Sequence, residues 1–231
     1  MSYSKDQIIK MCEKAAETMS GFYNAGFVNY GGTTKDGPFY TEVVSEWLLN
    51  NDNLKKFDTI RTITRTSSYR IVSHNGEIAR RTNRLEEITA KELFKVEGEL
   101  NCIGRIIDYQ TPLKNKQSDP SGKIDLLSIN DKEKIVYILE LKKKDSKDTM
   151  LKCVLESYTY LRIVDQEKLL KDFNIDPSSF KVKAAPFVYK DSAQYDEYKN
   201  KENHPFLHEL MNKLDIKPFF IEEKKQFIVS E

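Results

Sequence analysis

The chain has 231 residues, 39% of them hydrophobic, which is enough for one large domain or for a domain with an extension. Its 37 basic and 36 acidic residues nearly cancel, so any attraction for nucleic acid must come from a local patch. Three scattered cysteines indicate a reduced, cytoplasmic protein, and three histidines argue against a histidine-based catalytic or zinc site. The absence of a signal peptide and of a long apolar run predicts a soluble protein without a membrane partner.

Two helices are expected near the N-terminus. Apolar residues at helical spacing predict the first over residues 5–19, with Ser4 as its N-cap. The second is expected over residues 41–50, after a turn-rich loop. Glu42 and Glu46 lie four residues apart on this second helix, where they could be metal ligands. Paired glutamates on a helix more often belong to a solvated face, which is the interpretation we favour.

Residues 59–84 are strongly basic and contain a single acid, Glu77. A hairpin is expected here, because residues 69–73 and 77–79 flank the turn signal His-Asn-Gly. Arginine makes bidentate contacts with phosphate, so a cluster of this kind is typical of a nucleic-acid surface. An ordinary solvated hairpin whose arginines meet scattered acids is the open alternative. The arginines concerned are Arg61, Arg65, Arg70, Arg80, Arg81 and Arg84.

The next segment reads as a helix over residues 85–100, followed by a first sheet strand over residues 103–109. Glu86 and Glu87 fall in the first turn of this helix, where acids offset the helix dipole. Glu86 also lies near one edge of the apolar stripe, a position that would turn it towards the sheet.

A β-hairpin is predicted over residues 122–142. Two runs rich in Ile, Leu, Val and Tyr flank the polar residues 131–134, which is a strand–turn–strand signal. Both faces of the hairpin are otherwise apolar, and such strands are typical of the centre of a sheet that is covered on both sides. We assign one face to Leu127, Ile129, Val136 and Ile138, and the other to Ile124, Leu126, Tyr137, Leu139 and Leu141.

The register of this hairpin brings charged residues together. If Asn130 pairs with Ile135, then Asp125 lies directly opposite Glu140, with Cβ atoms about 5 Å apart. Lys142 projects from the same face as Glu140. Partly buried carboxylates are costly unless they are paired, and Lys142 can neutralise only one of the two. Mg²⁺ would be a suitable second partner, and a structural ion-pair cluster without metal is the alternative.

These residues resemble the signature of the PD-(D/E)xK nuclease superfamily. Asp125 stands in Gly-Lys-Ile-Asp-Leu-Leu, and Leu-Glu-Leu-Lys follows at residues 139–142. Ile124 takes the place of the Pro in the family name, which is a common variation. The resemblance covers about residues 85–160 and, more loosely, the last strands. It implies a restriction-endonuclease-like core made of a helix, three strands, a helix and a further strand, with the Asp at one end of the second strand.

The resemblance also implies roles for the motif residues. Asp125 and Glu140 would hold Mg²⁺ or Mn²⁺, and the main-chain carbonyl of Leu141 would be a further metal ligand. The metal would lower the pKa of bound water and polarise the phosphoryl oxygen. Lys142 would orient the attacking water and stabilise negative charge on the phosphate.

The flanking helices would supply helper residues in this superfamily. On the helix before the sheet the candidates are Glu86, Glu87 and Glu97; we choose Glu86, although compensation of the helix dipole explains any of them equally well. The helix after the hairpin is expected to run from Ser146, as N-cap, to about residue 164. Glu156 is its nearest match to a helper residue. It lies roughly 150° from the main apolar stripe, so an inward role requires a helix that is buried on two sides.

The C-terminal part is expected to complete the sheet. Strands are predicted over residues 180–189, 217–221 and 226–229, with a mostly helical segment over residues 196–214 that Pro205 interrupts. His204 and His208 are four residues apart, but Pro205 argues against a helical metal pair. We expect both histidines to be surface or packing residues.

Together these features predict an α/β fold with a central mixed sheet flanked by helices. Residues 1–58 would form a helical extension packed on a nuclease-like domain of residues 59–231. The expected function is metal-dependent hydrolysis of phosphodiester bonds in DNA, with Lys143, Lys144 and the arginine cluster following the DNA backbone. A non-catalytic nucleic-acid-binding or regulatory protein on the same fold is the alternative. A homodimer would suit the cutting of both DNA strands. The sequence contains no Gly-rich phosphate loop, so a small-molecule enzyme is not supported.

Overall fold

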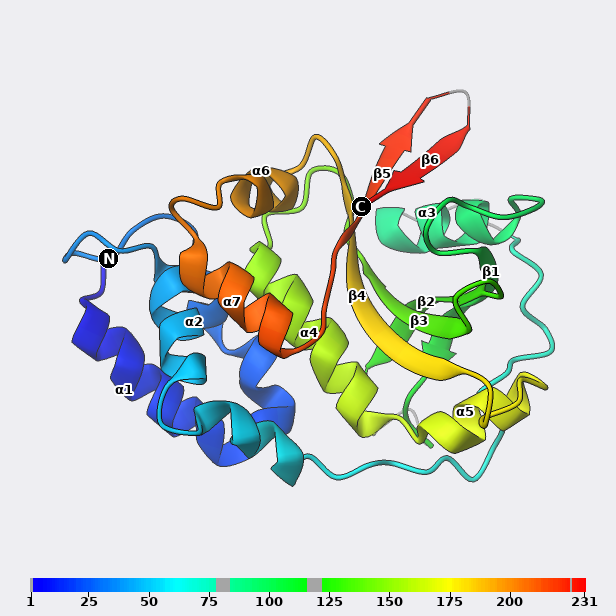
Figure 1. Cartoon of the computed structure of the whole chain (residues 1–231), viewed down its shortest axis with the longest axis horizontal. Helices are drawn as coiled ribbons and strands as arrows, with labels where there is room; N and C mark the ends of the chain where they lie inside the picture. Colours follow the sequence, from blue (N-terminus) through cyan, green and yellow to red (C-terminus); the bar gives the residue numbers. More distant parts are fainter. Residues whose placement is uncertain (1, 78–83, 116–121, 225) are drawn as a thin grey trace.

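The computed structural model of the chain describes residues 2–77, 84–115, 122–224 and 226–231 (Figure 1). Six strands form one mixed sheet in sequence order, so the predicted α/β architecture is confirmed. The first three strands are antiparallel, the next two run parallel to their predecessors, and the last is antiparallel. The strands are β1 (Arg105–Pro112), β2 (Lys123–Asn130), β3 (Ile135–Leu141), β4 (Lys181–Tyr189), β5 (Phe219–Glu223) and β6 (Phe227–Ser230).

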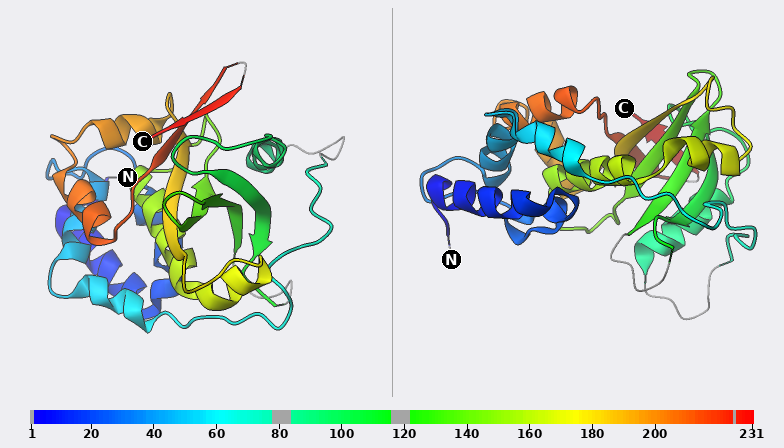
Figure 2. Two further views of the ribbon diagram at one scale, coloured as in Figure 1. Left: turned by 45° about the vertical axis from the view of Figure 1, so that its right-hand side comes forward. Right: turned by 90° about the horizontal axis from the view of Figure 1, so that it is seen from below.

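Helices cover both faces of the central strands, as the apolar pattern of the hairpin predicts (Figure 2). On one face α3 (Leu85–Phe94) packs against β1 and β2, and on the other α4 (Met150–Ile163) packs against β3 and β4. Two shorter helices, α6 (Ala193–Lys199) and α7 (Pro205–Lys213), lie between β4 and β5 in sequence. In the described part of the chain, no helix combines the length and the apolar character needed to cross a membrane.

The two faces of the hairpin are divided almost as predicted. Leu127 and Ile138 belong to the hydrophobic cluster on the α4 side, whereas Leu126 and Leu139 belong to the cluster on the α3 side. The assignment of Ile124 to the α3 side is wrong, because this side chain packs in the cluster on the α4 side. The regular pairing of β2 with β3 ends at Leu126, so the alternation of faces does not continue beyond it.

The N-terminal segment packs on the outer side of α4 and shares its hydrophobic cluster (Figure 1). It contains α1 (Lys5–Ala15), α2 (Tyr40–Leu49) and three 3₁₀ helices: η1 (Ala16–Asn24), η2 (Gly26–Asn29) and η3 (Asn53–Thr59). Ser4 is confirmed as the N-cap of α1, in a capping box with Gln7. The first helix is shorter than predicted, since its second half continues as a 3₁₀ helix with non-helical dihedrals at Thr18.

Two other local predictions are wrong, and one helix was not predicted. The described residues 69–77 form no strand; instead His74 Nδ1 lies 2.5 Å from Asp108 Oδ1, and the Gly76 N–H donates to the Tyr109 hydroxyl, so this loop docks onto β1. Helix α3 ends at Phe94 rather than at residue 100, because the chain turns there to form the Leu100–Gly104 bridge that precedes β1. Helix α5 (Gln166–Asp172) was not expected at all.

The N-cap predicted for α4 is also wrong. Helix α4 begins after Thr149, whose Oγ1 accepts the N–H of Lys152 at 3.1 Å. Ser146 Oγ instead accepts the N–H of Asp148, at 3.3 Å. Serine and threonine are both good N-caps, so the local sequence does not discriminate between the two positions.

The prediction that His204 and His208 are surface or packing residues is confirmed, since both pack against aromatic rings. His204 is buried against the ring of Phe39, with ring centroids 4.5 Å apart. His208 Nε2 lies 2.8 Å from the carbonyl oxygen of Tyr198, and the two rings of these residues are in contact.

The prediction that Glu42 and Glu46 lie on a solvated face is wrong for Glu42, which is only 6% exposed. Its carboxylate accepts the N–H groups of Phe206 at 2.9 Å and Leu207 at 2.8 Å, and so caps the first turn of α7. Negative charge is favourable at a helix N-terminus, and these N–H groups have no partner within the helix. Glu46 pairs with the half-exposed Lys5 at 2.6 Å.

The contrast between the two glutamates gives a direct test. Glu42→Ala leaves two N–H groups of α7 without an acceptor, one of them buried, so we expect a loss of about 1–3 kcal/mol in the free energy of unfolding. The matched change Glu46→Ala removes only a partly exposed pair and should cost about 1 kcal/mol or less. Urea denaturation at neutral pH measures both. Equal losses in the two variants would contradict the capping role.

Candidate active site

The hairpin that carries the charged residues pairs in the predicted register over most of its length. Asn130 pairs with Ile135, and the same register continues to Leu126, one residue short of Asp125. The expected pairing of Asp125 with Glu140 is not formed, because Asp125 lies just beyond the last pair and its side chain bonds to the Leu141 N–H instead.

Asp125 is held from both neighbouring strands. Its Oδ2 accepts the N–H of Leu141 in β3 at 3.1 Å, in place of a backbone carbonyl. Its Oδ1 accepts a hydrogen bond from Gln110 Nε2 in β1 at 2.9 Å. Gln110 has a left-handed backbone, with φ of 49°, which is uncommon for a residue other than glycine. The carboxylate of Asp125 is thus held between β1 and β3.

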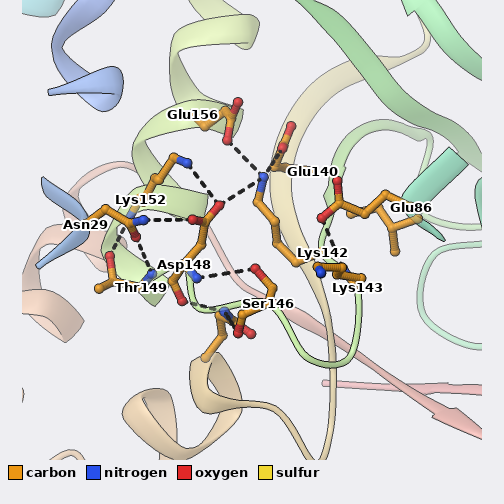
Figure 3. A network of polar contacts seen from close by, with 12 residues as sticks. Asn29, Glu86, Glu140, Lys142, Lys143, Ser146, Asp148, Thr149, Lys152 and Glu156 are labelled. Atoms are coloured by element: carbon orange, nitrogen blue, oxygen red, sulfur yellow. Dashed lines mark hydrogen bonds and ion pairs between the residues drawn. The ribbon is translucent and has the colours of Figure 1, made fainter. Parts of the chain in front are cut away.

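Lys142 is buried among three carboxylates (Figure 3). Its Nζ lies 2.6 Å from Glu140 Oε1, 3.0 Å from Glu156 Oε2 and 3.6 Å from Asp148 Oδ2. Burial alone would lower the pKa of Lys142, but the charges of Glu140 and Glu156 raise it far above its ordinary value. The side chain is therefore a fixed ammonium group.

Glu156 reaches this cluster because α4 is buried on two sides. The helix packs on β3 and β4 with one face, and on the N-terminal segment with another. The Glu156 carboxylate also accepts a hydrogen bond from the Tyr160 hydroxyl, at 3.1 Å. Glu156 can therefore point inward although it lies away from the main apolar stripe of α4, because the second buried face of the helix includes it.

Of the three acids considered near α3, Glu86 and Glu87 both line the hollow beside Asp125. Glu86 Oε1 accepts the N–H of Lys143 at 3.2 Å, and Gln110 lines the same hollow, which has a volume of about 360 Å³. Glu87 pairs with Lys91 at 2.7 Å, and Glu97 is exposed in the loop after the helix.

The site holds two linked groups of charge rather than one. Asp125 and Glu86 border the hollow, while Glu140, Lys142 and Glu156 lie buried behind it, and in the described residues Asp125 and Glu140 do not bond to each other. Burial raises the pKa of Asp125 to about 7, with Lys142 opposing and the charges of Glu86 and Glu156 adding to the shift. Burial and the charge of Asp125 raise the pKa of Glu140. Lys142 therefore does not neutralise all of these acids.

The described residues contain no group of three or more His, Cys, Asp and Glu side chains arranged to hold a metal ion. Sites that bind Mg²⁺ together with phosphate commonly use only one or two carboxylates, with water and substrate oxygens as the other ligands. Asp125 and Glu140 provide oxygen ligands of this kind, and Leu141, the residue after Glu140, bonds to Asp125 through its main-chain N–H.

The predicted nucleic-acid-binding arginines differ in their surroundings. Arg61 and Arg70 are exposed, and Arg84 is exposed at the start of α3, 3.8 Å from Glu87. Arg65 is only 7% exposed, and its guanidinium donates to the carbonyl of Pro112 at 3.3 Å and to that of Lys114. Arg65 therefore ties the loop to the end of β1 instead of facing solvent. Arg80 and Arg81 lie outside the described residues.

The two lysines after the motif lie at the surface. Lys143 is half-buried, with its Nζ 3.3 Å from Asp145, and its main chain contacts Glu86. Lys144 is exposed, and its Nζ lies 2.5 Å from Asp191. Both ammonium groups thus have carboxylate neighbours that a phosphate backbone would have to displace.

Three residues of the site were missed by sequence reasoning. Gln110 carries no local signal, because its position depends on the β1–β2 register and on a left-handed backbone. Asp148 could have been noticed, since it stands four residues before Lys152 at the start of a helix, a spacing that favours an ion pair. Asn29, which bonds to Asp148, lies 119 residues away in sequence and has no such signal.

The raised pKa of Asp125 predicts a pH dependence of stability. Its folded pKa, about 7, lies above the unfolded value of about 4, so the native state binds more protons in this window and stability falls as pH rises through it. Asp125→Asn removes the titrating carboxyl group and with it this loss of stability at high pH. In urea denaturation without divalent cations, the variant should be more stable than the parent at pH 8, and the difference should narrow towards pH 5. Parallel stability curves would contradict the assignment.

Comparison of the chain with protein-family models, with curated proteins and with solved structures gives no match. The likeness to the PD-(D/E)xK superfamily therefore remains one of motif and spacing, carried by Asp125, Glu140 and Lys142. Any function proposed for this chain stands on its own residues and their geometry.

Proposed function

We propose that this protein is a metal-dependent nuclease of the restriction-endonuclease-like type that hydrolyses phosphodiester bonds in DNA. The observation that carries the proposal is the hydrogen bond from the Leu141 N–H to Asp125, which joins Asp125 to the strand end that carries Glu140 and Lys142. The order α3, β1, β2, β3, α4 and β4 agrees with the core that the motif implies, with α5 added before β4. The flanking helices bring Glu86 and Glu156 to the same place.

The residues present fit a hard divalent cation such as Mg²⁺ or Mn²⁺. Asp125 and Glu140 are carboxylates whose pKa values are raised, first by burial and then by the charges of neighbouring acids, so a bound cation would favour their ionised forms. Together with the carbonyl of Leu141 they would hold the ion. When bound, the metal would lower the pKa of a water molecule and stabilise charge on the phosphate and on the leaving oxygen.

The other side chains would position the reacting groups. Lys142 would orient the attacking water and offset charge on the phosphate, with Glu140 and Glu156 fixing its ammonium. Gln110 and the Leu141 N–H would keep Asp125 in one rotamer. Glu86 faces the hollow beside Asp125, where an oxygen ligand or a water-binding group would be useful.

DNA is favoured as the substrate by the basic residues around the site. Arg84 and Lys143 line the same hollow as Asp125, and the exposed Arg61 and Arg70 lie on the loop that docks onto β1. With a net charge of only +1, the protein would depend on such local charges to follow a phosphate backbone.

One observation favours a second candidate, a non-catalytic nucleic-acid-binding or regulatory protein on this fold. Glu140 and Lys142 are only 4% and 6% exposed, and together with Glu156 they form an ion cluster that could serve as a structural element without any metal. Such a protein would bind DNA without cutting it.

Cleavage of supercoiled plasmid with Mg²⁺ or Mn²⁺ separates the two candidates. We expect cleavage by the parent protein and a loss of about a hundredfold or more in Glu140→Ala and Lys142→Ala, because each group would act on the transition state. Glu133→Ala, a change in the turn of the same hairpin, is the matched control and should retain activity. Unchanged cleavage in the first two variants would remove these residues from the mechanism. Binding without cleavage by the parent in both metals would favour the second candidate.

The basic segment can be tested separately by DNA affinity. The double variant Arg80→Ala with Arg81→Ala should bind duplex DNA more weakly, and its plot of log affinity against log salt should be less steep by about one to two units, since fewer counterions are released. Fluorescence anisotropy at several salt concentrations measures both quantities. Arg162→Ala, which breaks an ion pair with Asp58, serves as a charge-matched control for each single change. An unchanged slope in the double variant would exclude these arginines from the interface.

A further inference from the structure

A third acid beside Lys142 is outside the motif. Asp148, in the loop between β3 and α4, places its Oδ2 3.6 Å from Lys142 Nζ, which is ion-pair distance without a direct hydrogen bond. Glu140, Glu156 and Asp148 reach the ammonium from three directions (Figure 3). Asp148 therefore adds a third negative charge that acts on the position of the lysine.

The carboxylate of Asp148 is itself firmly held. Its Oδ1 accepts a hydrogen bond from Asn29 Nδ2 at 2.8 Å, and its Oδ2 accepts one from Lys152 Nζ at 3.0 Å. Its N–H donates to Ser146 Oγ, and Gln194 of α6 donates to its carbonyl oxygen. With both the main chain and the carboxylate anchored, Asp148 cannot follow Lys142 if the lysine moves.

Asn29 is the link between this carboxylate and the N-terminal segment. While its Nδ2 donates to Asp148, its Oδ1 accepts the N–H of Thr149 at 2.8 Å. The Thr149 hydroxyl donates to the carbonyl of Val28 at 2.9 Å. Residues 28–29 at the end of η2 thus make three hydrogen bonds to Asp148 and Thr149, just before α4 begins.

Electrostatics set Asp148 apart from Glu140. Although burial opposes it, the Lys152 hydrogen bond and the charge of Lys142 lower the pKa of Asp148, and Asn29 contributes to this lowering. Asp148 is therefore ionised at neutral pH, whereas the pKa of Glu140 is raised. A lysine on a flexible stem is placed by the charges around it, and Asp148 is a charge that persists.

On the basis of the proposed nuclease function, we propose that Asp148, fixed by Asn29, is a positioning residue that sets the place of the Lys142 ammonium in the candidate active site. The N-terminal segment would then complete the site instead of only covering α4. Lysine carries four rotatable side-chain bonds, and a misplacement of about 1 Å at a reacting group can cost about a hundredfold in rate. A fixed negative charge in the loop before α4 would keep the ammonium from shifting further towards Glu140 and Glu156.

The test follows the lysine directly, without metal or substrate. In protein labelled with ¹⁵N-lysine, the Lys142 ammonium is assigned as the signal that Lys142→Arg removes. Asp148→Asn and Asn29→Ala should each shift and broaden this signal. Asn53→Ala is the matched control, because Asn53 is also a buried asparagine of the N-terminal segment, bonded to the Trp47 carbonyl, away from the site. The control should leave the signal unchanged.

Single-turnover cleavage of plasmid DNA at saturating protein gives the second readout. We expect Asp148→Asn and Asn29→Ala to slow cleavage about tenfold or more, with DNA affinity within about twofold of the parent, and Asp148→Glu to recover part of the rate. A Lys142 signal that neither variant changes would overturn the proposal, as would parental cleavage rates in both. If the parent cuts no DNA with either metal, the nuclease function fails, and the ammonium signal alone decides whether Asp148 positions Lys142. The use of two variants protects the test if one of them does not fold.

Discussion

A single buried ammonium organises the candidate site. Lys142 is held by Glu140 from its own strand, by Glu156 from α4 and, at longer range, by Asp148 from the loop between them. A buried lysine stays charged only where acids compensate for its lost hydration. The folded structure therefore needs all three carboxylates close to the Lys142 ammonium. The hairpin, α4 and the connecting loop are therefore constrained together by one charge.

The remaining acids respond to a different constraint. Asp125 is fixed by Gln110 and by the Leu141 N–H, and it faces the hollow that Glu86 also borders. Its raised pKa reflects burial beside other carboxylates. Keeping such a group costs the metal-free protein stability above neutral pH, and sites that do chemistry often carry a cost of this kind.

The sequence predicted the parts of the structure that depend on short-range rules. Two apolar runs and the turn at residues 131–134 were enough to predict the register from Asn130–Ile135 to Leu126–Leu139, because a hairpin fixes its register locally. The same local rules failed for the His-Asn-Gly turn, where Gly76 bonds to Tyr109 rather than closing a hairpin. The buried cap that Glu42 makes on α7 joins segments 165 residues apart, and no pattern within α2 reveals it.

The hydrogen bond between Asn29 and Thr149 joins residues 120 positions apart in the chain. Gln194 of α6 donates a hydrogen bond to the same loop, at the carbonyl of Ser146. Contacts of such long sequence separation form late in folding, because the entropy of closing the intervening loop must be overcome first. During synthesis, a nascent chain that has released the hairpin but not α6 would lack part of the support for Lys142. Full support for the Lys142 ammonium would thus arise only after Gln194 has been synthesised and α6 has packed against the loop that carries Asp148.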